Sequence, residues 1–238
     1  MIKKIAYVTD SHLDEQFPKD YGIDARKNWN TVLQDIGQRK IDEIIFGGDI
    51  GSRESNEWFF STLKNFRYTI TPGNHDTFEE VAKYCNVGVD NDTNEIFHSR
   101  DDEFNRYIFL DTSTGNISQK QIDWVETQIQ TKKNSIIFIH HPVLSVPSEM
   151  DVKYPLANRD KLVSILKKAK KPLAIFCGHY HFDDLLVADH ITQIITPSAC
   201  FQVEKIKGKI KVISDTFGYR IIKINGTDIQ SELISFNT

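Results

Sequence analysis

Short apolar segments recur along the first three quarters of the chain, and most of their residues are β-branched or aromatic. Runs of four or five such residues are typical of strands that are buried on both faces of a sheet. The predicted strands are residues 5–9, 43–46, 68–71, 107–110, 135–139 and 173–177.

Apolar residues with helical spacing lie between several of these strands. From Trp29 to Ile36, apolar side chains follow the i, i+3, i+4, i+7 spacing that places them on one helix face. Residues 118–121, Ser-Gln-Lys-Gln, match a capping box and predict the start of another helix. Two further apolar sets predict helices over residues 58–66 and 162–169, the second of which is stopped by Pro172.

The pattern changes from about Ile191 to pairs of strands with short connections. Residues 203–206 and 210–213 flank Lys-Gly-Lys, and residues 219–224 and 229–234 flank a turn that contains Asn-Gly. Such connections are typical of antiparallel hairpins. Because no linker or repeat interrupts the chain, we predict one domain over residues 1–238, an α/β protein with mixed sheets covered by helices.

Composition excludes several classes of protein. Hydrophobic residues make up 39% of the 238 residues and charged residues 26%, which is a globular mixture and not that of a disordered or fibrous chain. No apolar run is long enough for a membrane span, and no secretory apolar region follows the first lysines. The net charge of −4 does not favour nucleic-acid binding. Three dispersed cysteines are consistent with a cytoplasmic protein, whose oligomeric state the sequence leaves open.

Polar side chains follow five of the predicted strands at the point where each strand ends. The segments are residues 10–12 (Asp-Ser-His), 47–49 (Gly-Gly-Asp), 72–76 (Pro-Gly-Asn-His-Asp), 140–142 (His-His-Pro) and 178–181 (Gly-His-Tyr-His). Open α/β sheets bind ligands at the carboxyl ends of their strands. A single histidine beside a strand is usually structural, but six of the eight histidines lie in these segments. The coincidence indicates a functional site.

The candidate ligands combine nitrogen and oxygen donors, and no cysteines occur at a chelating spacing. Asp-x-His and His-x-His place two side chains on one side of an extended segment, as two ligands of one ion require. This donor set favours Mn²⁺, iron (Fe²⁺ or Fe³⁺) or Zn²⁺ over Mg²⁺ alone. Seven candidate ligands are too many for one open catalytic ion, but they suit two divalent metal ions that share a carboxylate.

The five segments, in this order, resemble the calcineurin-like metallophosphoesterase superfamily, whose pattern is D-x-H, G-D, G-N-H-D, H-x-P and G-H-x-H. Further stretches are similar to its class III cyclic-nucleotide phosphodiesterase branch: residues 108–112, 117–124, 158–166, 196–198 and 218–221. The resemblance covers about residues 5–236. It implies a four-layer α/β/β/α sandwich of two mixed β-sheets flanked by helices.

The resemblance also implies a role for each motif residue. The ligands implied for one metal are Asp10, His12, Asp49 and His181. Those implied for the other are Asp49, Asn74, His140 and His179, with Asp49 as the bridge. The residues implied around the phosphate of an AMP-type nucleotide are His12, Asp49, Asn74, His75 and His181.

The H-x-P register selects His140 as the metal ligand, because neighbouring strand residues point to opposite faces. It leaves His141 either to contact a ligand residue from behind or to contact phosphate. In phosphodiester hydrolysis, two cations neutralise the anionic oxygens and lower the pKa of a bridging water, so that hydroxide can attack. The alkoxide that leaves needs a proton. We assign this proton to His75, with Asp76 orienting its ring; helix capping is the alternative role for Asp76.

Two further features have two explanations each. Tyr180 and Phe182 flank the last histidine pair, where they could stack on a nucleobase or simply pack in the interior. The lysines at alternate positions from 205 to 211 could attract polyanions, or they could protect an exposed strand from aggregation.

Three functions follow from this pattern. The first is hydrolysis of a small phosphodiester by a dinuclear metal site, with 3′,5′-cyclic nucleotides as the first choice. The second keeps the site and changes the substrate to a phosphomonoester, a nucleotide pyrophosphate, a glycerophosphodiester or nucleic acid. The third is a non-catalytic scaffold, which predicts eroded ligands, whereas here every expected ligand is present.

Overall fold

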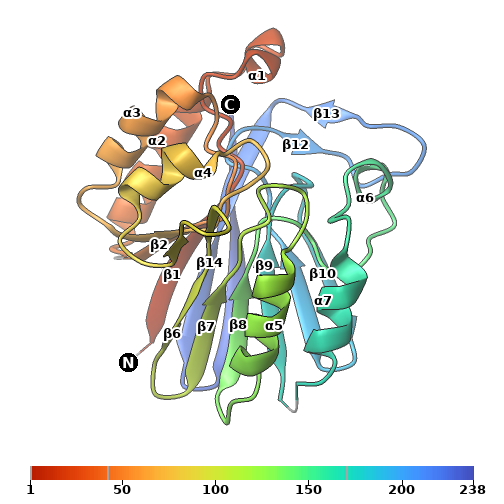
Figure 1. Cartoon of the computed structure of the whole chain (residues 1–238). Helices are drawn as coiled ribbons and strands as arrows, with labels where there is room; N and C mark the ends of the chain where they lie inside the picture. The colour runs from red at the N-terminus through yellow and green to blue at the C-terminus, as the bar shows by residue number, and fades with distance from the viewer. Residues whose placement is uncertain (1, 42, 170) are drawn as a thin grey trace.

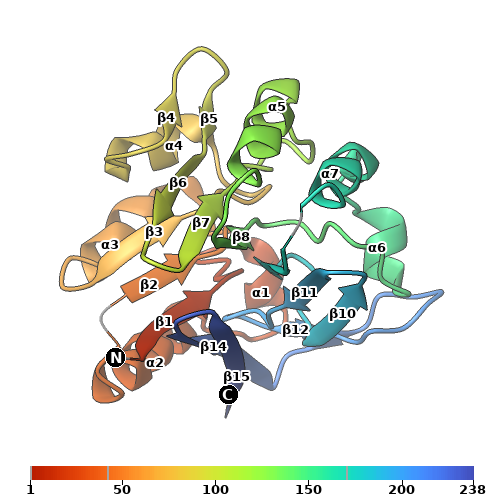
Figure 2. The same cartoon turned by 90° about the horizontal axis from the view of Figure 1, so that it is seen from below.

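The computed structural model describes residues 2–41, 43–169 and 171–238. Two β-sheets face each other in its centre, and helices cover their outer faces (Figure 1). Viewed along the strands, the layers follow one another from α2 and α3, through the two sheets, to α5 and α7 (Figure 2). The predicted fold class, an α/β protein with two mixed sheets flanked by helices, is confirmed.

The first sheet has five strands in the order β15-β14-β1-β2-β3. Three of them, β1 (Lys3–Val8), β2 (Glu43–Phe46) and β3 (Arg67–Ile70), are parallel. The hairpin of β14 (Thr216–Asn225) and β15 (Asp228–Asn237) adds to β1 in antiparallel orientation. This hairpin was predicted from its turn, and Gly226 supplies a positive φ of 61° there.

The second sheet has six strands in the order β10-β11-β9-β8-β7-β6, with β7, β8, β9 and β11 parallel. Their bounds are β6 His98–Asp101, β7 Asn105–Phe109, β8 Asn134–Phe138, β9 Leu173–Cys177, β10 Asp184–Ala188 and β11 Ile191–Ile195. Two short antiparallel pairs lie outside both sheets: β4 (Val89–Asp90) with β5 (Glu95–Ile96), and β12 (Gln202–Val203) with β13 (Val212–Ile213).

Seven α-helices are present in the described residues, and none of these is long and apolar enough to cross a membrane. Their bounds are α1 Gln16–Asp20, α2 Ala25–Gln38, α3 Asn56–Thr62, α4 Phe78–Val81, α5 Gln119–Gln128, α6 Glu149–Lys153 and α7 Arg159–Leu166. Two single 3₁₀ turns, Arg53–Ser55 and Ala82–Tyr84, precede α3 and follow α4. The predicted helix starting at Ser118 is confirmed, because the Ser118 hydroxyl accepts a hydrogen bond from the Gln121 amide.

Both faces of the central strands are buried, as the continuous apolar runs predicted. On β1, Ala6 and Val8 contribute to the core beneath α2 and α3, whereas Ile5 and Tyr7 face the second sheet. The Tyr7 ring lies 5.6 Å from that of Phe138, between centroids. A third cluster joins the second sheet to α5 and α7. The two sheets therefore share one interior, which holds their carboxyl ends in a constant relation.

Some elements differ from the predictions. The hairpin expected over residues 203–213 contains only two paired positions on each strand. Helix α3 ends at Thr62, before two of the apolar residues assigned to it, and α7 ends at Leu166. Helices α1, α4 and α6 were not predicted, because helices of four or five residues are too short to show a helical period. Strand β10 was not predicted either.

His98 is one of the two histidines outside the strand-end segments, and its ring stacks on that of Phe109 at 4.6 Å. Burial, together with the charge of Arg100, lowers its pKa to about 4. In the unfolded chain the same ring takes up a proton near pH 6.5. The stability contributed by neutral His98 is therefore present above pH 6.5 and lost as the pH falls toward 4.

We expect His98→Phe to keep a ring stacked on Phe109 and to remove this loss of stability at low pH. Between pH 7 and pH 4 the free energy of unfolding of the wild-type protein should fall by about 2–3 kcal/mol more than that of the variant. Urea denaturation at each pH measures the difference, in which the other titrating groups cancel. Parallel curves for the two proteins would contradict the prediction.

Candidate metal centre

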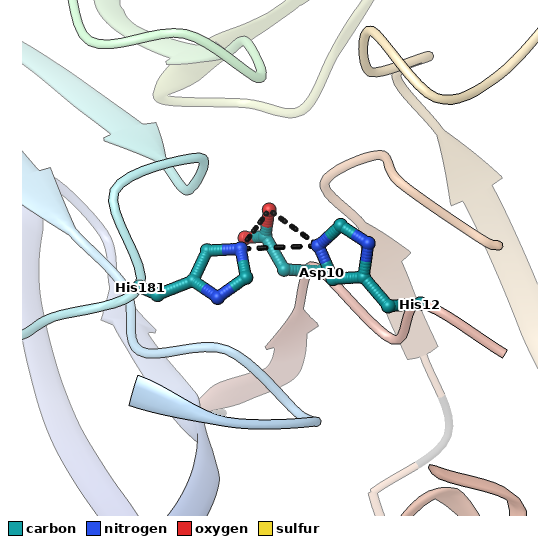
Figure 3. A group of neighbouring side chains, drawn as sticks. All are labelled: Asp10, His12 and His181. Carbon is teal, nitrogen blue, oxygen red and sulfur yellow. Dashed lines mark hydrogen bonds and ion pairs between the residues drawn. The ribbon is translucent and has the colours of Figure 1, made fainter. Parts of the chain in front are cut away.

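The polar segments that follow β1, β2, β3, β8 and β9 meet at one end of the sandwich, at the top of Figure 1. Parallel strands bring their carboxyl ends to the same edge of a sheet, and the two sheets bring these edges together. Six of the predicted ligands form two clusters, in each of which the ligand atoms lie within 4.8 Å of one another. The Asp10 cluster contains Asp10, His12 and His181 (Figure 3), and the Asp49 cluster contains Asp49, His140 and His179.

Asn74 adds to the Asp49 cluster, and Asp49 lies between the two clusters. The Asn74 Oδ1 atom lies 3.2 Å from His140 Nε2, which adds an oxygen donor to the Asp49 cluster. The Asp49 Oδ2 atom lies 3.3 Å from His140 Nε2 and 3.8 Å from His12 Nε2. This carboxylate therefore occupies the position between the clusters that a bridging ligand requires.

Each histidine of the clusters has its outer ring nitrogen within hydrogen-bond distance of an oxygen acceptor. The four pairs are His12 Nδ1 with Glu15 Oε2 (3.0 Å), His140 Nδ1 with the Gly47 carbonyl (2.8 Å), His179 Nε2 with the Tyr154 carbonyl (2.9 Å) and His181 Nδ1 with the Phe201 carbonyl (3.1 Å). A carbonyl oxygen only accepts, so the outer nitrogen must carry the proton. The inner nitrogen points into the cluster, where it can present its lone pair to a metal ion, as in metal-bound histidines.

These inner nitrogens face one another at short distances. His12 Nε2 lies 3.0 Å from His181 Nε2, and His140 Nε2 lies 3.2 Å from His179 Nδ1. The buried carboxylates of Asp10 and Asp49 lie beside these nitrogens. Burial opposes the charged form of His140, but the Asp49 carboxylate raises its pKa to about 9, so the Asp49 cluster attracts positive charge. A cation in each cluster would offset the charge of the buried carboxylates and accept the inner lone pairs. The residues present therefore fit two metal ions with mixed nitrogen and oxygen ligands.

The carboxylate of Asp49 stays ionised in this interior. Burial alone would raise its pKa, but the rings of His140 and His12 more than offset burial and hold the pKa well below its usual range. Burial likewise opposes ionisation of Asp10, and the neighbouring ring of His181 reverses the effect and lowers the pKa. Both carboxylates are thus charged and available as ligands.

The backbone at the ligands is left-handed. Positive φ angles are found at Asp10 (58°), His12 (42°), Asp49 (61°), His179 (69°) and His181 (56°). Residues other than glycine rarely adopt this conformation, and such strain concentrates at functional sites. The side chains of residues 10 and 12 thus reach one cluster, as predicted, but they do so through left-handed turns and not through the alternation of an extended segment.

Asp76 does not have either of the roles predicted for it. Its carboxylate accepts hydrogen bonds from the backbone amides of Gly73 (2.8 Å), Asp49 (2.8 Å) and Ile50 (2.9 Å). These bonds join the loops after β2 and β3 and place Asp49. Helix capping was also wrong, because α4 begins at Phe78 and Thr77 is its N-cap.

Glu15 orients the ring of His75, and the sequence did not indicate it. The Glu15 Oε1 atom lies 2.9 Å from His75 Nδ1, while Oε2 contacts His12 Nδ1. Burial would raise the pKa of Glu15, but its hydrogen bonds with the two rings lower it to about 2. The hydrogen bond with Glu15 in turn raises the pKa of His75 to about 9. One carboxylate thus holds a predicted metal ligand and the predicted proton donor.

A cavity of about 370 Å³ opens beside the clusters. Part of its wall belongs to the site: His12, Glu15, Asp49, Asn74, His75, His179 and His181. The rest is apolar or aromatic: Phe17, Met150, Tyr154, Phe201, Val203, Ile210 and Val212. Tyr180 is fully buried with its hydroxyl on Asp151, so its packing role is confirmed and it does not form part of this wall.

Residues 3–183, most of the chain, match the family described as calcineurin-like phosphoesterase. The chain belongs to this family. A protein of Fibrobacter succinogenes named "Probable cyclic nucleotide phosphodiesterase" is 26% identical over 85% of this chain and 82% of its own. A glycerophosphodiester phosphodiesterase of Enterobacter lignolyticus is 28% identical over 74% of this chain and 70% of its own.

Among solved structures, a dimetal phosphatase from Danio rerio matches this calcineurin-like phosphoesterase over 98% of each chain. The TM-score is 0.68 and the sequence identity 11%, so this likeness concerns the fold alone. The fold and the family expected from the strand-end motifs are both confirmed.

Within this calcineurin-like phosphoesterase, His140 and His141 have different surroundings. His140 belongs to the Asp49 cluster, whereas His141 is buried behind it with Nδ1 2.9 Å from the Thr112 hydroxyl. Burial and the neighbouring ring of His179 hold the pKa of His141 well below its usual range. His141 is not among the described residues that line the cavity, so the structure gives no support to its predicted contact with phosphate.

This arrangement predicts different metal contents for two matched variants. After reconstitution with Mn²⁺ and dialysis, His140→Ala should retain about one ion per chain, because its Asp49 cluster has lost a ligand. His141→Ala should retain about two, as the wild type should. Elemental analysis of the dialysed proteins gives the ratio. Full metal content in His140→Ala, or the same loss in both, would refute the assignment.

Proposed function

We propose that this protein is a dinuclear metal-dependent phosphodiesterase that hydrolyses small phosphodiesters, with 3′,5′-cyclic nucleotides as first choice, and that residues 1–238 act as one domain. The observation that carries the proposal is a pair of His/Asp clusters, with Asp49 between them, on the wall of a small cavity. A volume of about 370 Å³ suits a small molecule. The relatives that are named as phosphodiesterases support a diester substrate.

The chain's own residues supply the ligands and the positioning. The proposed ligands of one ion are Asp10, His12, Asp49 and His181, and those of the other are Asp49, Asn74, His140 and His179. When bound, two divalent ions neutralise the phosphate oxygens and make hydroxide available near neutral pH. Manganese, iron and zinc all suit this donor set.

His75 is the proposed proton donor to the leaving alkoxide. Its side chain is 44% exposed and lies on the wall of the cavity, beside His12. Because Nδ1 is bound to Glu15, Nε2 is the ring nitrogen that can donate to a substrate. The remaining groups proposed to surround the phosphate are His12, Asp49, Asn74 and His181, all of which line the same cavity.

A glycerophosphodiester is the second candidate substrate, because one relative is named for that activity. Phosphomonoesters, pyrophosphates and nucleic acids use the same chemistry and differ in what surrounds the phosphate. A scaffold without activity is disfavoured, since all seven proposed ligands are present and converge.

The test is hydrolysis of bis(p-nitrophenyl) phosphate beside p-nitrophenyl phosphate by the Mn²⁺-reconstituted protein, with a chelated sample and Asp49→Ala as controls. We expect metal-dependent turnover of the diester, and less than about one per cent of it in Asp49→Ala, which removes the carboxylate between the clusters. A panel of cyclic nucleotides and glycerophosphodiesters then ranks the substrates. Turnover of the monoester alone would contradict the proposed phosphodiesterase activity and indicate a phosphatase.

Glu15→Gln should lower kcat about tenfold or more while KM changes little. The glutamine amide can accept from one ring only, so either His12 or His75 loses its orienting bond. Steady-state kinetics with bis(p-nitrophenyl) phosphate measures the split, and Glu57→Gln, on the exposed surface of α3, is the matched control. Equal kcat values in both variants would contradict the proposed role of Glu15 in orienting the two rings.

A further inference from the structure

The apolar part of the cavity comes from segments that the motifs do not include. Phe17 lies on α1, Met150 on α6, and the residue that follows α6 is Tyr154. The remaining apolar residues, Phe201, Val203, Ile210 and Val212, belong to or flank the β12–β13 pair. No lysine or arginine is among the described residues that line this cavity. Its two halves therefore differ sharply in polarity.

Aromatic rings lead from the metal ligands into the apolar half. The ring of Phe201 lies 4.4 Å from that of His181 and 5.4 Å from that of Phe17, between centroids. Phe201 is buried and its carbonyl accepts the His181 hydrogen bond, so it is tied to the Asp10 cluster. Phe17 is 47% exposed and lines the same cavity, and its ring also lies 5.1 Å from that of Tyr21.

None of the four lysines at positions 205, 207, 209 and 211 lines the cavity, and two of them are already paired. Lys205 forms an ion pair with Asp184 at 2.6 Å, and Lys211 forms one with Glu204. Neither lysine lines the cavity, whereas the carboxylate of Glu15 does. A second phosphate in the apolar half would therefore lose its hydration without meeting a cation. An uncharged ring would bury apolar surface there instead.

We propose that this half of the cavity is a subsite for an uncharged aromatic ester group, with Phe17 as its stacking surface, and that it selects against a second phosphate and against short hydroxylated groups. The proposal rests on the proposed function, because the phosphate at the metal clusters places the ester group. The subsite is continuous with the clusters through Phe201, and the cavity volume of about 370 Å³ suits one small ligand.

The test is direct binding, which needs no turnover. Isothermal titration calorimetry of the Mn²⁺-loaded full chain compares phosphate monoesters, so that the metal contribution is common to all ligands. Phenyl phosphate should bind about tenfold more tightly than methyl phosphate, as stacking on one ring predicts. Adenosine 5′-monophosphate should bind more tightly than adenosine 3′,5′-bisphosphate.

Three variants locate the effect. Phe17→Ala should weaken phenyl phosphate binding about five- to tenfold and change methyl phosphate binding less than about twofold. Phe104→Ala removes a similarly exposed ring (45%, against 47% for Phe17) that is not part of the cavity, and it should behave as the wild type. Val212→Lys places a cation in the apolar half and should reverse the preference between the two adenosine phosphates.

Equal affinities for phenyl and methyl phosphate in the wild type would overturn the subsite. An unchanged ratio in Phe17→Ala, with normal metal content and circular dichroism, would overturn it as well. Failure of the proposed function has a different signature. If the protein prefers phenyl phosphate but does not hydrolyse bis(p-nitrophenyl) phosphate, the subsite proposal stands and the phosphodiesterase proposal is wrong.

Discussion

The site depends on one constraint, which is the close approach of ring nitrogens in a buried cluster. His12 Nε2 lies 3.0 Å from His181 Nε2. The outer nitrogens of both rings are bound to Glu15 and to the Phe201 carbonyl, so the inner nitrogens point toward each other. The same arrangement recurs at His140 and His179. Buried carboxylates beside such nitrogens are unfavourable unless positive charge lies among them. The donor set fits metal ions, and the surrounding structure has to keep it assembled.

Backbone turns at the strand ends keep the clusters assembled. Five proposed ligands have positive φ angles, and Asp76 joins the two loops that carry Asp49 and Asn74. Close approach adds a further demand at Gly178, where a Cβ atom would lie 2.2 Å from Thr9 Oγ1 and 2.4 Å from Asp10 Oδ2. Only glycine leaves room for the Asp10 carboxylate. The shared interior of the two sheets holds these turns, and strain of this kind persists only where such packing opposes its release.

The cavity combines this polar cluster with an apolar wall that comes from other segments. The family match ends at residue 183, so it includes Phe17, Met150 and Tyr154, whereas Phe201, Val203, Ile210 and Val212 follow it in the chain. In the function and the subsite proposed above, chemistry and substrate choice are divided between segments. The strand ends would supply the metal ligands, and α1, α6 and the β12–β13 pair would select the ester group beside the phosphate. Such a division would let one fold serve many phosphoesters, because the outer segments can change while the ligands stay.

The sequence by itself determined the central strands, the main helices and the residues that form the two clusters, because these depend on local periodicity and on motifs of three to five residues. It also identified His140, and not His141, as the member of the Asp49 cluster. Only the tertiary structure showed that Glu15 meets His75, 60 positions away, that Asp76 joins two loops, and that Phe17 lies beside Phe201. Contacts between residues so far apart in sequence have no period and no motif. They arise from how the two sheets pack and from short elements such as α1, whose few residues carry no helical pattern.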